Sequence, residues 1–437
     1  MNLSREFQNQ SLSFVVLLLL LKASLDLLYV IYIVPAWPNK GFLLEPDYLR
    51  LLESWMMYAA LLVFIPARLS RPSDFFVLLL LIFVLIPVLS MFALGAEPRW
   101  IAYSVLLACG LIHITRNIKG RAIPVIPGGP KSSLILSMTM LLVTICWLFV
   151  SQDMTDISFQ FDELYKQRKN FNQNINHGVF AYLLSWAFKV FNLYLMAYSL
   201  HKKKWFAAIA CLALQIFLFV LTGQKIVLAF DMVVLLVWGY YQKHNDLRLV
   251  PACILITILV VSVIWYASGD RYSYPISLVV RRMFFVTANN IYDYFVFFSQ
   301  NNFVFWSNSI TSGLFEYPYS ENYPNLIGNY QAQMLEENWE EISINRGVYA
   351  NSSFIATAYM HAGITGVVFY SAVVGAICRT IDLTVDTSQP GWMVVAVMAA
   401  PLTSLLTGAD LPTAILTHGV LAGIVLLVIA RSPAQSY

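Results

Sequence analysis

The chain has 437 residues, of which 59% are hydrophobic and only 12% are charged, and its mean hydropathy is +0.67. This composition excludes an ordinary soluble globular protein, and the unbroken Leu, Val and Ile runs predict membrane-spanning helices instead of the alternating strands of a membrane barrel. A net charge of +3 gives no indication of nucleic-acid binding, because the basic residues lie in short connections between apolar runs.

Twelve apolar runs are long enough, some of them with adjoining loop residues, to cross an apolar layer of roughly 30 Å. They lie at 12–34, 51–67, 75–94, 100–115, 133–150, 178–200, 205–221, 226–241, 249–267, 353–377, 392–407 and 411–430. The predicted fold class is therefore all-α, a polytopic membrane helix bundle of about 12 transmembrane helices. Arg5 precedes the first run without a small-residue cleavage site after it, so this run is predicted to be a retained span.

The predicted spans divide the chain into three parts. Residues 1–267 hold spans 1–9 with a small outer loop at 152–177. Residues 268–352 form a large outer loop, and residues 353–437 hold spans 10–12.

Lysine and arginine residues recur in alternate connections, and the positive-inside rule places these connections in the cytoplasm. The residues are Arg68, Arg71, Arg116, Lys119, Arg121, Lys131, Lys202, Lys203, Lys204, Lys243, Arg248, Arg379 and Arg431. Both termini are then expected in the cytoplasm, and the two longest loops are expected together on the opposite face.

The large loop is longer than a connection requires, and its many aromatic residues argue against disorder. Apolar residues at helical spacing over 283–299 predict an amphipathic helix, too polar to span, that lies along the interface or packs on the bundle. Pro318 and Pro324 predict irregular structure. The glutamate-rich stretch 335–344 predicts a short, solvated helix.

The first candidate site is a group of cations expected on the outer face. Its members are Lys225, Arg271, Arg281, Arg282 and Arg346. Arginine matches phosphate with two parallel donors, so the group is predicted to hold a lipid-linked diphosphate. Snorkelling of individual arginines at the headgroup level is the alternative interpretation.

Two further candidates lie near the ends of predicted spans. Gln224 and Lys225 begin the eighth span, where backbone N–H groups favour an anion, although an ordinary tight turn explains the same pattern. His361 lies inside the tenth span as a candidate acid or base, or as a packed hydrogen-bonding residue. Gly363 and Gly366 beside it predict close helix packing or a flexible turn.

Other ionisable residues within the runs are predicted to be structural. They are Lys189, Asp231, His418 and the pair Lys22 and Asp26, which lie one turn apart and can neutralise each other. The five cysteines lie in or at the ends of apolar runs, so neither disulfides nor a cysteine-based metal site is predicted. The chain has no nucleotide-binding G-x-x-x-x-G-K-[ST] loop and no H-E-x-x-H motif, so no cofactor and no metal are expected.

Three segments within roughly 220–378 resemble the bacterial O-antigen repeat-unit polymerases, the Wzy-type oligosaccharide polymerases. They are Gly223-Gln224-Lys225, Arg281-Arg282-Met-Phe-Phe-Val-Thr, and the stretch from Asn351 through His361 to Val367. The resemblance implies a GT-C-like fold and an enzyme of the bacterial inner membrane whose active site faces the periplasm. Such an enzyme joins undecaprenyl-diphosphate-linked repeat units and uses no cofactor.

The residues and partners expected for this activity follow from the motifs and from position. The predicted catalytic residues are Arg281, Arg282, Arg346 and His361. The predicted substrate contacts are Gln224, Lys225, Arg271, Asn351 and Tyr359. Expected partners are the undecaprenyl-diphosphate-linked oligosaccharide, membrane lipids, a chain-length regulator and a flippase. An O-antigen ligase, which moves the finished glycan to another lipid, and a lipid-linked oligosaccharide flippase or transporter remain as alternatives.

The chemistry expected at such a site is stabilisation of a leaving diphosphate, where losing one charge-stabilising group typically costs about 10²–10³ in rate. The sequence leaves the general base open among several residues. They are Asp270, Glu316, Glu321, Glu336, Glu337 and His361. Aromatic residues of the large loop either stack on sugar rings or pack the loop on the bundle. They are Trp306, Tyr317, Tyr319, Tyr323 and Trp339.

Overall fold

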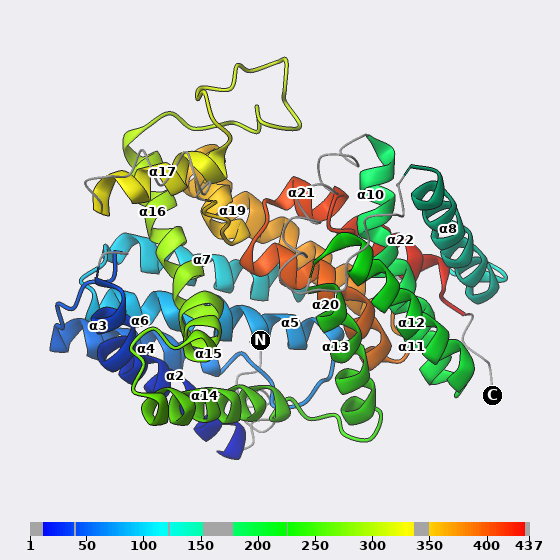
Figure 1. The fold of residues 1–437 in the computed structure, drawn as a ribbon, viewed down its shortest axis with the longest axis horizontal. Helices are drawn as coiled ribbons and strands as arrows, with labels where there is room; N and C mark the ends of the chain where they lie inside the picture. Colours follow the sequence, from blue (N-terminus) through cyan, green and yellow to red (C-terminus); the bar gives the residue numbers. More distant parts are fainter. Residues whose placement is uncertain are drawn as a thin grey trace.

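The computed structural model describes residues 12–38, 41–120, 123–151, 178–224, 226–335 and 349–432, and all regular structure in these ranges is helical (Figure 1). The helices, with π-helical segments written η, are α2 (Leu12–Leu28), η1 (Tyr29–Ile33), α3 (Val34–Ala36), α4 (Tyr48–Leu62), α5 (Pro72–Leu80), η3 (Leu81–Leu85), α6 (Ile86–Leu94), α7 (Arg99–Arg116), α8 (Gly129–Ser151), α10 (Val179–Trp186), η5 (Ala187–Phe191), α11 (Asn192–His201), α12 (Trp205–Thr222), α13 (Ile226–Tyr241), α14 (Leu249–Ser268), α15 (Tyr274–Ile276), η6 (Ser277–Phe285), α16 (Val286–Gln300), α17 (Tyr323–Leu335), α19 (Phe354–Asp382), α20 (Gly391–Thr407), α21 (Leu411–Leu416) and α22 (Val420–Ile429).

Every apolar run predicted from the sequence coincides with helix in the described part of the chain, so the all-α prediction is confirmed there. Among the helices of the described ranges, seven are long and apolar enough to cross a membrane. They are Leu12–Ala36, Pro72–Leu94, Gly129–Val150, Val179–His201, Trp205–Thr222, Leu249–Ser268 and Phe354–Asp382. The count of twelve spans and the orientation stay predictions.

Several of these helices expose apolar side chains outward, as lipid-facing helices do. On α14, the side chains of Leu259 and Val263 are 63% and 59% exposed, and Ile256 is exposed to a similar extent. An apolar surface of this kind is unfavourable in water and is suited to an acyl-chain environment.

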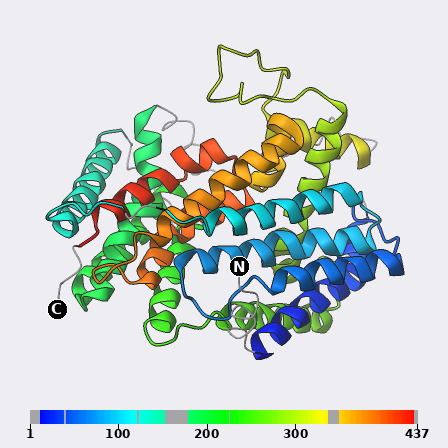
Figure 2. The same cartoon turned by 180° about the vertical axis from the view of Figure 1, so that it is seen from behind.

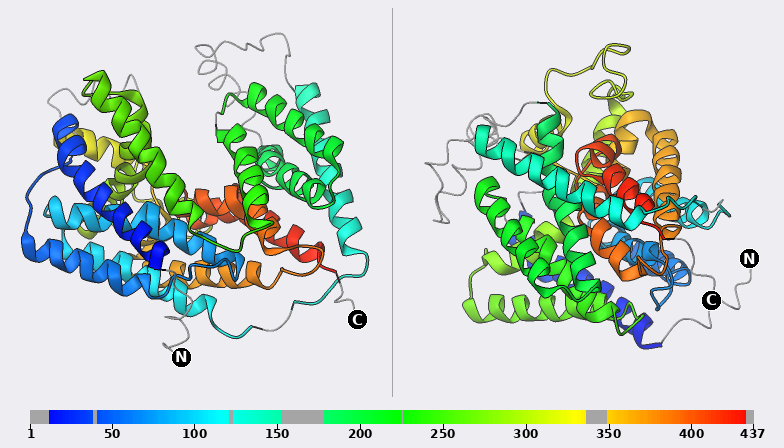
Figure 3. Two further views of the ribbon diagram at one scale, coloured as in Figure 1. Left: turned by 90° about the horizontal axis from the view of Figure 1, so that it is seen from below. Right: turned by 90° about the vertical axis from the view of Figure 1, so that its right-hand side faces the viewer.

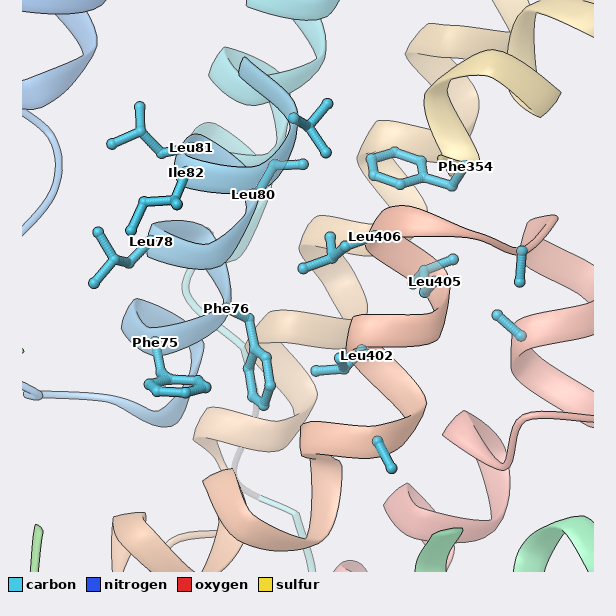
Figure 4. Close-up of a cluster of buried hydrophobic side chains, with 14 of the residues drawn as sticks. Phe75, Phe76, Leu78, Leu80, Leu81, Ile82, Phe354, Leu402, Leu405 and Leu406 are labelled. Carbon is cyan, nitrogen blue, oxygen red and sulfur yellow. The ribbon is translucent and has the colours of Figure 1, made fainter. Parts of the chain in front are cut away.

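Helices α4, α5–η3–α6 and α7 run side by side, and α19 packs along α7 (Figure 2). A tight core forms where α5 and η3 face α19 and α20, with Phe76, Leu402 and Leu405 nearly inaccessible to solvent (Figure 4). Truncation of Leu405 to alanine is expected to cost about 2–5 kcal/mol, because the surrounding helices cannot fully close the cavity.

Buried ion pairs join neighbouring helices. Lys22 contacts Asp26 at 3.1 Å, as the one-turn spacing predicted, and Ser90 of α6 donates to the same carboxylate. Arg116 of α7 pairs with Asp74 of α5 at 3.0 Å, and both side chains are almost fully buried. Removing one partner of such a pair leaves an uncompensated charge, which makes these contacts important for the packing of the helices.

The α8, α10, η5, α11, α12 and α13 helices form a second group, and α20 packs against both groups. Figure 3 shows the two groups from below, with α14 in the first group and α12 and α13 in the second. Residues at the α12–α13 turn therefore belong to a different part of the bundle from those on η6 and α16.

The segment after α14 forms a helix that crosses one end of the bundle. In Figure 1, α16 stands almost perpendicular to α5, α6 and α7, and it packs against α6 and α19. Of the two placements that the sequence left open for this helix, packing on the bundle is confirmed.

Pro324, predicted in irregular structure, instead lies in the first turn of α17, where its missing N–H has no helical partner to lose. The loop 152–177 lies outside the described residues, as does the glutamate-rich stretch beyond Leu335.

Candidate functional site

The crossing helix, which comprises α15, η6 and α16, carries one apolar face and one polar face. Pro275 starts it in the first turn. Val280, Phe284 and Ile291 are fully buried against the bundle. The nine-residue π-helical segment η6 contains both adjacent arginines, and π-helical turns occur frequently at functional sites.

Arg281 is held in place by local contacts. Its guanidinium lies 4.1 Å from the ring centroid of Trp37, and its Nε donates to Ser277 Oγ at 3.1 Å. Partial burial, together with the charge of Arg282, lowers its pKa from the usual value, but an arginine remains cationic. Arg281 is therefore a fixed positive charge whose donors are partly used within the protein.

Arg282 differs from its neighbour because it is exposed and makes no ion pair or hydrogen bond with the described residues. The adjacent side chains Leu278 and Met283 are 40% and 44% exposed. A free guanidinium flanked by apolar surface can bind a phosphate group attached to a lipid chain. Arg271, in the turn between α14 and α15, is also exposed.

The structure describes three of the five predicted cations, Arg271, Arg281 and Arg282, and it places the predicted substrate contact Gln224 elsewhere in the bundle. Gln224 lies in the α12–α13 turn, after the left-handed Gly223, among the second group of helices. It therefore belongs to a different group of helices from η6, which packs with α14, α15 and α16, and its predicted role as a substrate contact stays a prediction. Lys225 and Arg346 lie outside the described residues.

An amide and carboxylate cluster lies farther along the crossing helix. Asp293 Oδ2 accepts from Asn289 at 2.7 Å and from Gln331 of α17 at 2.6 Å. Gln331 also donates to Asn290 Oδ1 at 2.8 Å, and Asn290 donates to the backbone carbonyl of Asn351 at 2.7 Å. The cluster thus joins α16, α17 and the start of α19, and Asn351 contributes its backbone there.

Two carboxyl groups at this end titrate near neutral pH. Burial raises the pKa of Glu97, in the α6–α7 connection, to about 8, and the nearby charge of Asp293 adds to the effect. Burial also raises the pKa of Asp293 to about 7, although the hydrogen bond from Gln331 acts to lower it. Partly buried carboxyl groups with such values are candidates for acid or base chemistry. Glu97 was missed by sequence analysis, since one glutamate in a short connection has no distinguishing pattern.

The distance between Arg281 and Asp293 along the crossing helix limits the chemical roles that Asp293 can have. Asp293 follows Arg281 by twelve residues, which corresponds to about 18 Å along a helix. A base must lie within hydrogen-bond reach of the proton it removes. Asp293 is thus too far along the helix to serve as the base for a bond breaking next to a diphosphate on Arg281.

His361 lies in a closed hydrogen-bonded network with Trp306, Tyr370 and Asp410, called here the Trp306 network. His361 Nδ1 accepts from the Trp306 backbone N–H at 3.0 Å, so Nε2 carries the proton that it shares with Asp410 Oδ2 at 2.9 Å. Tyr370 donates to Asp410 Oδ1 at 3.0 Å and accepts from Trp306 Nε1 at 2.7 Å.

The environment of His361 corrects its predicted catalytic role. The side chain is 0% exposed, both ring nitrogens are engaged, and the ring stacks on Trp306 with centroids 5.0 Å apart. Such a histidine holds a loop against the bundle, and its ring is inaccessible from solvent in this conformation. The predicted packed, hydrogen-bonding alternative is the one that the structure supports.

Tyr359 is also placed differently from the prediction. Its ring is 7% exposed and stacks on Phe295, with centroids 4.1 Å apart, while Trp100 and Phe303 pack nearby. The structure therefore gives Tyr359 a packing role in place of the predicted substrate contact, because rings from α16, from α7 and from the segment after α16 pack against it.

Fold and site together define a helical membrane-type protein with a cationic and carboxylate-bearing crossing helix at one end of the bundle. Comparison of the chain with models of known protein families, with curated proteins and with solved structures finds no match.

Proposed function

We propose that this protein is a glycosyltransferase of the bacterial inner membrane, with its active site on the periplasmic face, that polymerises undecaprenyl-diphosphate-linked repeat units, as the resemblance to Wzy-type polymerases implies. The observation that carries the proposal is the exposed Arg282, which forms no ion pair with the described residues, beside the exposed apolar side chains of Leu278 and Met283. A polyprenyl diphosphate needs a cation and an apolar surface at the same point, and η6 offers both.

The rest of the crossing helix supports an extended glycan substrate. Arg281 adds a second, fixed charge beside Arg282, which favours the negative charge that builds on a leaving diphosphate. Asp293 and its amide neighbours lie about 18 Å farther on, where sugar rings of the same substrate would extend. Hydroxyl groups are well matched by amide and carboxylate side chains.

Reconstitution tests the proposal. The purified full-length protein is placed in liposomes with lipid-linked repeat units from its source strain and no energy source. Products with two or more repeat units are expected. Unchanged single units, with or without movement across the bilayer, would exclude a polymerase, and movement alone would favour the transporter alternative.

A deletion strain separates the polymerase from the ligase. A strain that lacks the polymerase is expected to accumulate lipopolysaccharide with a single repeat unit. Loss of all glycan-capped lipopolysaccharide would instead indicate the ligase.

A further inference from the structure

The segment between α16 and α17 forms an open pocket of about 500 Å³, which is within the size range of small-molecule sites. It is formed by two short stretches of chain that meet beyond the end of α16. The lining residues are Asn301, Asn302, Phe303, Val304, Phe305, Phe315, Glu316 and Pro318.

The lining has the chemistry of a site for an uncharged, hydroxyl-rich ligand. Phe305 and Phe315 are 46% and 56% exposed, with ring centroids 6.3 Å apart, and they offer flat apolar faces. Asn301 and Asn302 supply amides, and the exposed Glu316 supplies a carboxylate. Among the described residues, no lysine or arginine lines the pocket, so this lining is unsuited to a phosphate group. Sugar rings, with apolar faces and hydroxyl edges, match this combination.

The backbone beneath the pocket is strained. Phe305 and Trp306 are consecutive left-handed residues with φ of 49° and 59°. Each such conformation costs roughly 1–3 kcal/mol in a residue other than glycine, and this kind of strain clusters at ligand-binding sites. Other contacts must therefore hold the segment in this shape.

Those contacts come from a break in α19. Ala362 and Gly363 leave the helical conformation, which frees the carbonyls of the preceding turn. Val304 N–H donates to Met360 O at 3.0 Å, and Phe305 N–H donates to His361 O at 3.1 Å. The Trp306 network fixes the next residue. The pocket floor is thus bonded directly to a bundle helix, which gives a preformed site.

We propose that this pocket is a subsite for sugar rings of the glycan, with Phe305 and Phe315 stacking on ring faces and Glu316 accepting from hydroxyl groups. The inference rests on the proposed function and deepens it, since it separates recognition of sugar from recognition of diphosphate on η6. A protein partner for the same exposed rings is the competing occupant.

Binding is measured on the full-length protein in nanodiscs by saturation-transfer NMR and calorimetry. The probe is the free oligosaccharide released by mild acid from lipid-linked repeat units of the source strain, so that no diphosphate is present. Phe315→Ala and Glu316→Gln, both at exposed positions, are each expected to weaken binding about tenfold. Phe206→Ala, at a 92% exposed phenylalanine on α12, is the matched control and is expected to bind normally.

The outcomes separate this inference from the proposed function. If the wild type does not bind the oligosaccharide, or if Phe315→Ala and Glu316→Gln bind it as well as Phe206→Ala does, the subsite is wrong, even when reconstituted wild type lengthens glycan. If binding is lost only in the two pocket variants but the wild type lengthens nothing, the subsite stands and the polymerase proposal fails. Unchanged oligosaccharide binding together with loss of a co-purifying protein would assign the pocket to that partner.

Discussion

Nε2 of His361 lies 2.9 Å from Oδ2 of Asp410, and both side chains are almost completely inaccessible to solvent. This contact joins the broken helix α19 to the start of α21, where Asp410 also caps the helix by accepting from the Leu411 N–H. Because Trp306 donates to the other nitrogen of His361, the same contact determines where the segment after α16 lies.

Asp410→Ala is expected to destabilise the protein by about 2–4 kcal/mol, because it leaves two buried donors unsatisfied and removes a helix cap. The measurement is thermal unfolding in detergent, combined with limited proteolysis of residues 301–322, whose cleavage should accelerate. His244→Ala, at an exposed histidine between α13 and α14, should change neither. An unaltered melting temperature and cleavage pattern in the Asp410 variant would contradict a structural role for the Trp306 network.

Gly363→Ala is expected to destabilise the protein by about 1–2 kcal/mol, because Gly363 has φ of +61°, where other residues are strained. An added Cβ would also lie 3.1 Å from Phe303 Cζ. Gly239→Ala on α13 is the matched control, since its Cβ meets nothing within 4 Å and alanine favours a helix by up to about 1 kcal/mol. Equal melting temperatures for the two variants would show that the break in α19 does not need glycine.

Arg282→Ala is expected to abolish or sharply shorten polymer with an unchanged melting temperature, because its side chain is exposed and makes no ion pair or hydrogen bond with the described residues. Arg282→Lys should restore only part of the length, since a point charge cannot reproduce a two-pronged phosphate contact. The readout is the ladder of glycan lengths on a gel. Normal ladders from both the alanine variant and the Arg281→Ala/Arg282→Ala double variant would exclude η6 as the diphosphate site.

Arg281→Ala is expected to act differently from Arg282→Ala, because it removes the contact with Trp37 as well as a charge. A cation over an aromatic ring contributes about 0.5–2 kcal/mol, so the melting temperature should fall along with polymer length. Trp37→Phe keeps a ring and should lie between Arg281→Ala and wild type in stability. A stable Arg281→Ala protein would show that the Trp37 contact is dispensable.

Stability is expected to decrease as the pH rises, owing to Glu97. Its pKa is about 8 in the folded protein and 4.5 as an ordinary carboxyl group, so the folded state favours the protonated form. The resulting stabilisation is complete below about pH 4.5 and is lost as the pH rises through 8. Melting temperatures between pH 5 and pH 9 should fall less steeply for Glu97→Gln than for wild type. Glu45→Gln, at an exposed glutamate, should keep the wild-type slope, and identical slopes for all three proteins would argue against a buried protonated Glu97.

Helix positions could be predicted from the sequence because apolar periodicity is a local property. The crossing helix was also predictable, since its apolar residues recur at helical spacing while Asn289 and Asp293 make it too polar to span. The burial of the crossing helix in the bundle was not predictable, because it depends on contacts with α6 and α19, which are distant in the chain.

The site was less predictable for the same physical reason. His361 and Asp410 are 49 residues apart, and nothing in either local sequence indicates that they meet. The pKa of Glu97 is raised only because folding places its carboxyl group in a partly buried environment near Asp293. The arginine pair was visible as adjacent charges, but the difference between a packed Arg281 and a free Arg282 depends on Trp37, from the other end of the chain.

The burial of α16 has a consequence for how the protein is made. Its polar residues Asn289, Asn290 and Asp293 cannot enter a bilayer unaided, and their cover includes α17 and α19, which are synthesised later. Until residues 354–382 have been synthesised, α19 is not present to pack against the crossing helix. The helices that precede α16 can therefore insert earlier, whereas the candidate site is assembled only after α17 and α19 have been synthesised.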